Sequence, residues 1–114
     1  MVGVGSITEE RLAKNEAFFR SVNERIREIV GEQGADGHVY EFICECADTT
    51  CLERVHLTIA EYEAVRASGT RFVVAAGHEI DAIETVVAES HASIVVEKVG
   101  VAAEVADALD PRAA

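Results

Sequence analysis

The segment CECADTTC, residues 44–51, contains the three cysteines of the chain in the spacing C-x-C-x4-C. Zinc prefers a tetrahedron of thiolate and imidazole ligands. Residues two apart in a strand point to the same face, so Cys44 and Cys46 can face one point. A four-residue turn can then bring Cys51 back to that point. The spacing therefore predicts a metal site, chiefly for zinc, at the end of a strand.

A histidine from elsewhere in the chain should complete the tetrahedron, and we predict His78. It follows the apolar segment RFVVAAG, and Gly77 allows the backbone to turn there. The carboxylate of Glu79 could orient the ring. The other candidates are less favourably placed, at the far end of a strand, inside a strand and on a solvated loop respectively: His38, His56 and His91.

Three thiolates and one imidazole would close a zinc site and leave no position for a reactive water, which argues against catalysis. If the cysteines alone bind, an open position would permit an enzyme. A redox pair of thiols and inert buried thiols are further alternatives. A nucleophilic pair of Cys51 and His56 would have nothing to orient it, and an iron–sulfur cluster would usually need a fourth cysteine.

The chain is acidic, with a formal net charge of -11 from 21 acidic and 10 basic residues. This charge argues against binding to nucleic acid or to an anionic membrane surface. A basic protein partner or a cationic ligand fits, although solubility alone is the simpler explanation of the charge. We find no apolar run of about 20 residues and no signal-peptide pattern. A cytoplasmic protein, in which thiols stay reduced, is therefore expected.

The 114 residues predict one domain over 6–110, with a flexible leader at 1–5 and a tail at 111–114. A long helix should begin at Ser6 or Thr8 and end near Gly34. Its apolar stripe is interrupted at Asn15 and comprises Leu12, Phe19, Val22, Ile26 and Ile29. The stripe predicts either packing on the protein's own sheet or a homodimer seam with Asn15 setting the register.

Strands predicted at about 38–44 and 52–57 form an antiparallel hairpin with the cysteines at its tip. Thr58 and Glu61 have capping-box spacing and should start a short helix that Gly69 closes. Further strands are predicted at RFVVAAG and SIVVEKVG and a helix at VAAEVADAL, whereas HEIDAIETVVAES suits either a helix or a turn followed by a strand. These elements predict an α+β fold with a mainly antiparallel sheet.

Two acidic residues flank the cysteine region, and as strand residues Glu41 and Glu45 should face solvent. In EYEAVR, Tyr62 and Arg66 lie four apart and could form a protein-docking patch. The simpler interpretation is that Tyr62 and Val65 pack in the core while Arg66 lies in solvent.

Four segments, RLAKNEAFFRSVNERI, FICECADTTCLERVHLTIAEYEAVRA, RFVVAAGHE and IVVEKVGVAAEVAD, together resemble a family of small uncharacterised actinobacterial proteins. Its members combine C-x-C-x4-C with L-T-x-x-E-Y-E-x-V-R and F-V-V-x-x-G-H. The resemblance covers nearly the whole chain and implies an actinobacterial cytoplasmic protein. It supports Cys44, Cys46, Cys51 and His78 as one set and implies no reaction.

These observations predict a small cytoplasmic Cys3His zinc-binding module that acts by binding a protein. The alternative is a thiol redox sensor in which oxidation of the cysteines ejects the metal. An enzyme with an open metal site is the third hypothesis.

Overall fold

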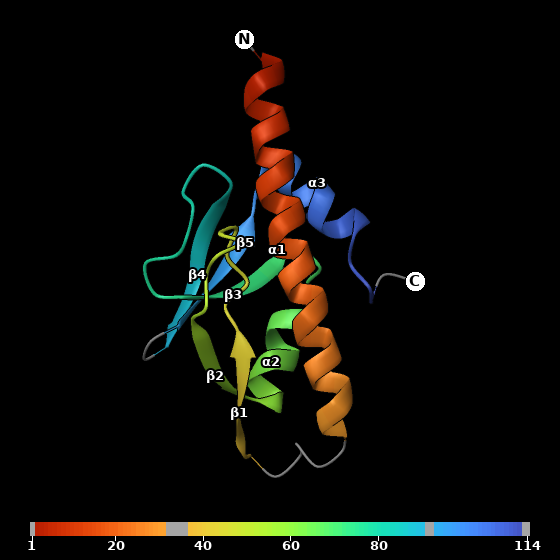
Figure 1. Cartoon of the computed structure of the whole chain (residues 1–114), viewed down its shortest axis with the longest axis vertical. Helices are drawn as coiled ribbons and strands as arrows, with labels where there is room; N and C mark the ends of the chain where they lie inside the picture. The colour runs from red at the N-terminus through yellow and green to blue at the C-terminus, as the bar shows by residue number, and fades with distance from the viewer. Residues whose placement is uncertain (1, 32–36, 91–92, 113–114) are drawn as a thin grey trace.

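The computed structural model describes residues 2–31, 37–90 and 93–112. Helices and strands alternate irregularly along these residues, as expected of the predicted α+β fold (Figure 1). The elements in chain order are α1 (Val2–Val30), β1 (Val39–Ile43), β2 (Arg54–Thr58), α2 (Ile59–Arg66), β3 (Arg71–Ala75), β4 (Glu84–Ser90), β5 (Ser93–Lys98) and α3 (Gly100–Ala108).

The strands form two small antiparallel sheets rather than one. β1 and β2 pair as the predicted hairpin, with Phe42 opposite Val55. The other sheet has the order β3-β5-β4, so β4 lies at its edge. HEIDAIETVVAES is a turn followed by a strand, and its helical alternative is wrong. Within β4 the register shifts between Val86 and Ala88, which marks a β-bulge.

The core lies where the two sheets, α1 and α2 meet. Phe42 of β1 stacks on Tyr62 of α2 with ring centroids 4.6 Å apart. Thr58 and Glu61 form the predicted capping box, in which each side chain accepts a hydrogen bond from the other residue's backbone N–H. This cap fixes where α2 begins, directly after β2, and so places Tyr62 on the sheet.

Helix α1 differs from its prediction at both ends. It begins at Val2, so residues 2–5 of the predicted leader are helical and neither Ser6 nor Thr8 is its first residue. It ends at Val30, where Gly31 takes the left-handed φ of +59° that commonly terminates a helix. Gly34, the predicted end, lies outside the described residues.

The most buried face of α1 is mainly polar, and the predicted apolar stripe lies beside it and packs only in part. Among residues 8–30 of the helix, the buried ones are Ala13, Glu16, Ala17, Arg20 and Asn23. All residues of the stripe but one are partly buried, Leu12 and Ile26 against the core, whereas Ile29 is 75% exposed. The polar side chains can be buried because each finds a partner on another element.

Three charged side chains meet between α1 and the sheet that contains β4 and β5. Lys98 of β5 forms ion pairs with Glu16 of α1 and with Glu84 of β4, and all three side chains are fully buried. The Lys98 ammonium also lies 4.8 Å from the centre of the Phe72 ring. Burial raises the pKa of Glu16 to about 8, although Lys98 opposes the shift.

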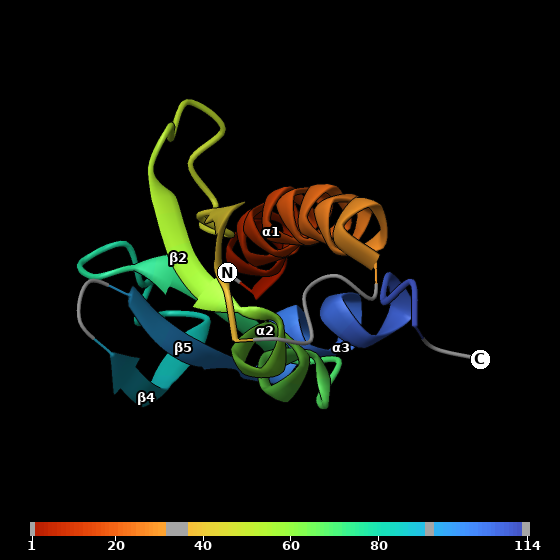
Figure 2. The same ribbon diagram turned by 90° about the horizontal axis from the view of Figure 1, so that it is seen from below.

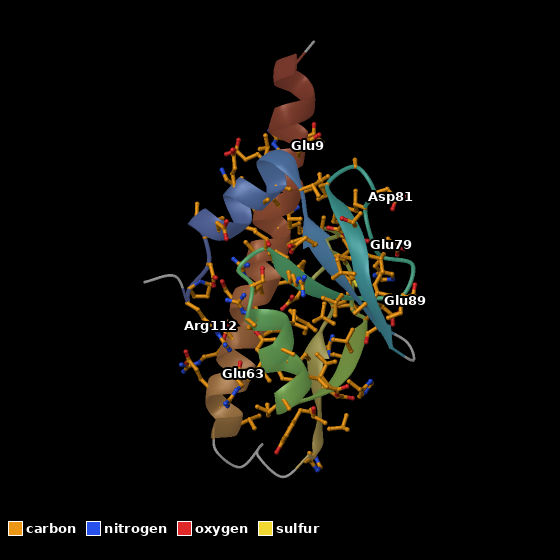
Figure 3. All side chains as sticks on the ribbon, turned by 180° about the vertical axis from the view of Figure 1, so that it is seen from behind. Glu9, Glu63, Glu79, Asp81, Glu89 and Arg112 are labelled. Carbon is orange, nitrogen blue, oxygen red and sulfur yellow. The ribbon has the colours of Figure 1, made fainter. Side chains whose placement is uncertain are left out.

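A second ionic cluster ties the end of the chain to the helices. Arg66, predicted to lie in solvent, is instead buried and pairs with Glu24 and Asp110, while Tyr62 and Val65 are buried as expected. Arg112 lies within the predicted tail, and its Nε is 2.7 Å from Glu24 Oε1. It also pairs with Glu63 (Figure 3).

Candidate metal centre

Cys44 and Cys46 lie on the segment that passes from one sheet to the other. The N–H of Cys44 donates to Glu53 O at 3.1 Å and so continues the hairpin pairing, whereas the N–H of Glu45 donates to Val73 O on β3 at 2.9 Å. Both cysteines are buried, at 3% and 2% exposure. These two backbone hydrogen bonds, one to each sheet, therefore hold the thiols of Cys44 and Cys46 against β3.

Glu45, between the two cysteines, points toward the interior, and its predicted exposure is wrong. Its Oε2 accepts from Asn23 Nδ2 of α1 at 2.8 Å, and its Oε1 accepts from the N–H of Val73 at 3.0 Å. Burial raises the pKa of Glu45 to about 7, against the lowering effect of these hydrogen bonds. The strand alternation indicates that this side chain faces away from the thiols, but nothing local indicates that α1 covers that side. Glu41, by contrast, is exposed as predicted.

A tight turn brings Cys51, the third cysteine, back toward Cys44 and Cys46. The N–H of Cys51 donates to Asp48 O at 3.0 Å. The carboxylate of Asp48 accepts from the N–H and the hydroxyl of Thr50, at 2.9 and 2.7 Å. Such bonds between an aspartate and the backbone two residues later stabilise turns. The loop sequence thus explains why Cys51 lies back beside the other two thiols.

A second turn, directly after β3, places His78. The N–H of His78 donates to Ala75 O at 3.0 Å, and Gly77 has a φ of +89°. A positive φ at the third position of such a turn favours glycine, as the sequence predicts. The turn directs the imidazole toward the cysteine loop, where Nδ1 lies 3.5 Å from the Sγ atoms of both Cys44 and Cys51.

The four side chains have the spacing of a metal site. Their ligand atoms all lie within 4.8 Å of one another. Zn–S bonds of about 2.3 Å and Zn–N bonds of about 2.0 Å in a regular tetrahedron place sulfur about 3.5 Å from nitrogen and about 3.8 Å from another sulfur. The two sulfur–nitrogen distances of 3.5 Å fit this figure. A single thiol–imidazole hydrogen bond would require one sulfur near Nδ1, whereas two are present.

The surroundings suit thiolates only if a cation is bound. Burial raises the pKa of the Cys44 thiol and that of the Cys46 thiol. The N–H of Ala75 donates to Cys44 Sγ at 3.1 Å, which partly offsets that cost. A metal ion would supply the missing positive charge and hold the thiols deprotonated. The donor set of three sulfurs and one nitrogen fits zinc chemistry.

The other histidines do not reach this cluster. His56 is exposed on β2 and its ring lies 3.3 Å from Glu41. His38 is exposed and contacts the ring of Tyr40 edge-on. His91 lies outside the described residues. The predicted role of Glu79 is not seen, since its buried Oε1 has no hydrogen-bond partner in the described part of the chain.

The cluster is accessible from one side. Cys51 and His78 are partly exposed, and a hollow of about 270 Å³ opens next to His78. Its lining is formed by Cys46, Ala47, Asp48, Gly77, His78 and Ile80. Small solutes can therefore approach the ligand atoms although two of the thiols are buried.

The fold and the cluster define a small α+β protein that could hold one metal ion between a hairpin loop and the turn after β3. No family model matches the chain, and comparison with curated proteins and with solved structures finds no similar protein. The actinobacterial resemblance therefore stays a prediction. None of the helices in residues 2–31, 37–90 and 93–112 is long and apolar enough to cross a membrane.

Proposed function

We propose that this protein is a zinc-binding module in which Cys44, Cys46, Cys51 and His78 hold one Zn²⁺. The observation that carries the proposal is the position of His78 Nδ1, at 3.5 Å from two sulfurs at once. Four protein ligands close the tetrahedron, so the metal stabilises the fold and does not activate water. The zinc would join the β1–β2 hairpin loop to the end of β3.

A closed site suggests that the protein acts by binding another macromolecule in a reducing compartment such as the cytoplasm. Its net charge of -11 favours a basic protein partner over nucleic acid. A homodimer through α1 is the other form of this proposal. Phe18 of α1 is 64% exposed and borders the same shallow hollow as Leu109, which gives that helix an apolar contact surface.

Metal content of protein purified without added metal tests the proposal. Native mass spectrometry should show one zinc ion in the wild type and a weaker complex in His78→Ala. His56→Ala is the matched control, because it removes an exposed histidine outside the cluster and should retain the zinc ion. Wild-type protein without metal, with three freely titrating thiols, would refute the zinc site.

The accessible side of the cluster favours a second candidate, a thiol redox sensor. Hydrogen peroxide would oxidise Cys51 to a sulfenic acid and release one water. A neighbouring thiol, within 4.8 Å, would then displace a second water and form a disulfide. The net reaction converts two thiols and one peroxide into a disulfide and two waters, and the zinc is released.

The two candidates differ in their response to peroxide. A structural site should keep its zinc at micromolar hydrogen peroxide, since the metal protects its thiolates. A sensor should release zinc in proportion to the disulfide formed, measured with a chromogenic chelator and by mass spectrometry of the same sample. Release of zinc from the wild type but not from Cys51→Ser loaded with metal would favour the sensor.

A further inference from the structure

The packing of α1 depends on specific polar contacts more than on apolar burial. Among residues 8–30 of the helix, the two buried apolar residues are alanines, Ala13 and Ala17. An alanine buries little surface, so the hydrophobic contribution at these positions is small. Leu12, Ile26 and Val30 add partial burial. The helix is therefore held by the partners that its polar side chains find.

Two asparagines of α1 form hydrogen bonds with residues 43–47, the segment that contains Cys44 and Cys46. Asn23 Nδ2 donates to Ile43 O at 2.9 Å, and its Oδ1 accepts from the N–H of Ile43 at 2.8 Å. The same amide nitrogen donates to Glu45 Oε2 at 2.8 Å. Asn15 Nδ2 donates to Ala47 O at 3.2 Å. Figure 2 shows the segment after β1 lying beside α1.

These contacts alternate with the thiols along the chain. Residues 43, 45 and 47 bond to α1, whereas Cys44 and Cys46 between them face the cluster. One short segment thus has the metal ligands on one side and the helix on the other. Asn15 and Asn23 lie eight residues apart, about 12 Å along the helix axis, so the segment contacts α1 over two turns.

We infer that metal binding and the docking of α1 are coupled through Asn15, Asn23 and Glu45; this inference rests on the proposed metal site. Bound metal fixes Cys44 and Cys46 and therefore the positions of the groups that the asparagines need. Without metal the segment is held by its hydrogen bonds alone and opens more often, and each opening deprives the Asn23 amide of buried partners, which is costly. α1 then docks less tightly, held by its remaining bonds to β5 and α3. Because coupling between two equilibria is reciprocal, a docked α1 also tightens metal binding.

Hydrogen exchange of the full chain tests whether loss of the metal loosens the docking of α1. Amides of residues 13–27 should exchange at least about 10-fold faster after a chelator removes the zinc, whereas β4 and β5 should keep their protection. Unchanged protection of α1 in the metal-free protein would overturn the inference, as would an equal loss of protection in every element, which indicates global unfolding.

The zinc affinity of asparagine variants tests whether a docked α1 tightens metal binding. Asn23→Ala should weaken zinc binding about 10- to 100-fold, the effect usual for residues that orient metal ligands. Asn15→Ala removes a single partly buried bond and should act in the same direction more weakly, which keeps the test informative if Asn23→Ala does not fold. Val65→Ala is the control: it removes buried apolar volume from α2 and should lower stability without changing zinc affinity.

The outcomes separate the inference from the proposed function. Absence of zinc in the wild type would refute both. Zinc bound with wild-type affinity by both Asn15→Ala and Asn23→Ala would refute the coupling and leave the metal site intact. Equal weakening in Asn23→Ala and Val65→Ala would show that affinity follows overall stability, which also overturns the coupling.

Discussion

The buried carboxyl of Glu16 should make this protein less stable as the pH rises from acidic to neutral. Glu16 and Glu84 share the single ammonium of Lys98, and all three side chains are fully buried. One ammonium neutralises one carboxylate, so the second carboxyl is favoured in its protonated form. This agrees with a pKa of about 8 for Glu16, raised mainly by burial and further by Glu84.

The sign and size of the effect follow from linkage. A glutamate in the unfolded chain has a pKa of about 4.3, so between this value and about 8 the folded state holds one more proton than the unfolded state. The stability from protonated Glu16 is complete below the unfolded pKa and is lost as the pH rises through the folded pKa. Integration gives a loss of about 2.5 kcal/mol in the free energy of unfolding between pH 5 and pH 7.

Urea denaturation of wild type and Glu16→Gln at several pH values isolates this contribution. Glu45, whose pKa burial raises to about 7, also contributes to the pH dependence, but its effect is common to both proteins and cancels in the difference. Glu16→Gln should have about the same free energy of unfolding as the wild type at pH 5. At pH 7 its free energy of unfolding should be higher than that of the wild type by about 2.5 kcal/mol. Glu104→Gln, which changes an exposed carboxylate on α3, should show no such difference. Parallel pH profiles for wild type and Glu16→Gln would refute the reasoning.

Three further predictions follow from the site and the core. Chelation of the metal should lower the thermal midpoint by more than about 10 °C, since removal of a tightly bound ligand costs several kcal/mol; an unchanged midpoint by calorimetry would contradict this. Gly77→Ala should cost about 1–3 kcal/mol, because alanine is strained at a φ of +89°, and should weaken zinc binding by displacing His78; unchanged stability and affinity would be evidence against the turn. Tyr62→Phe should leave stability unchanged or raise it by about 1 kcal/mol, because the buried hydroxyl has no hydrogen-bond partner among the described residues; a loss above about 1 kcal/mol in urea denaturation would indicate a partner for that hydroxyl.

Features that depend on neighbours in the sequence could be predicted. The hairpin, the capping box of Thr58 and Glu61, and the turn at Gly77 each arise within a few residues, and the structure contains them all. The grouping of the three cysteines was predictable for the same reason. Their meeting with His78, 27 residues after Cys51, was predicted instead from the chemistry of a fourth metal ligand and from the turn at Gly77.

Features that depend on distant partners could not be predicted. The burial of Glu45 depends on Asn23, 22 residues away, and that of Arg66 on Asp110, 44 residues away. Local periodicity treats such polar residues as a solvent face, and for this reason it predicted the partly buried stripe of α1 but missed the buried polar residues beside it. A helix whose packed face is polar carries no signature of that face in its own sequence.

The bulge in β4 bears on how the protein avoids aggregation. β4 is an edge strand whose Val86 and Val87 are partly exposed, and a regular strand of this kind could pair with a second chain and begin a fibril. The register shift between Val86 and Ala88 interrupts the row of backbone groups that such pairing needs. The single extra residue thus protects the exposed valines of this strand from self-association.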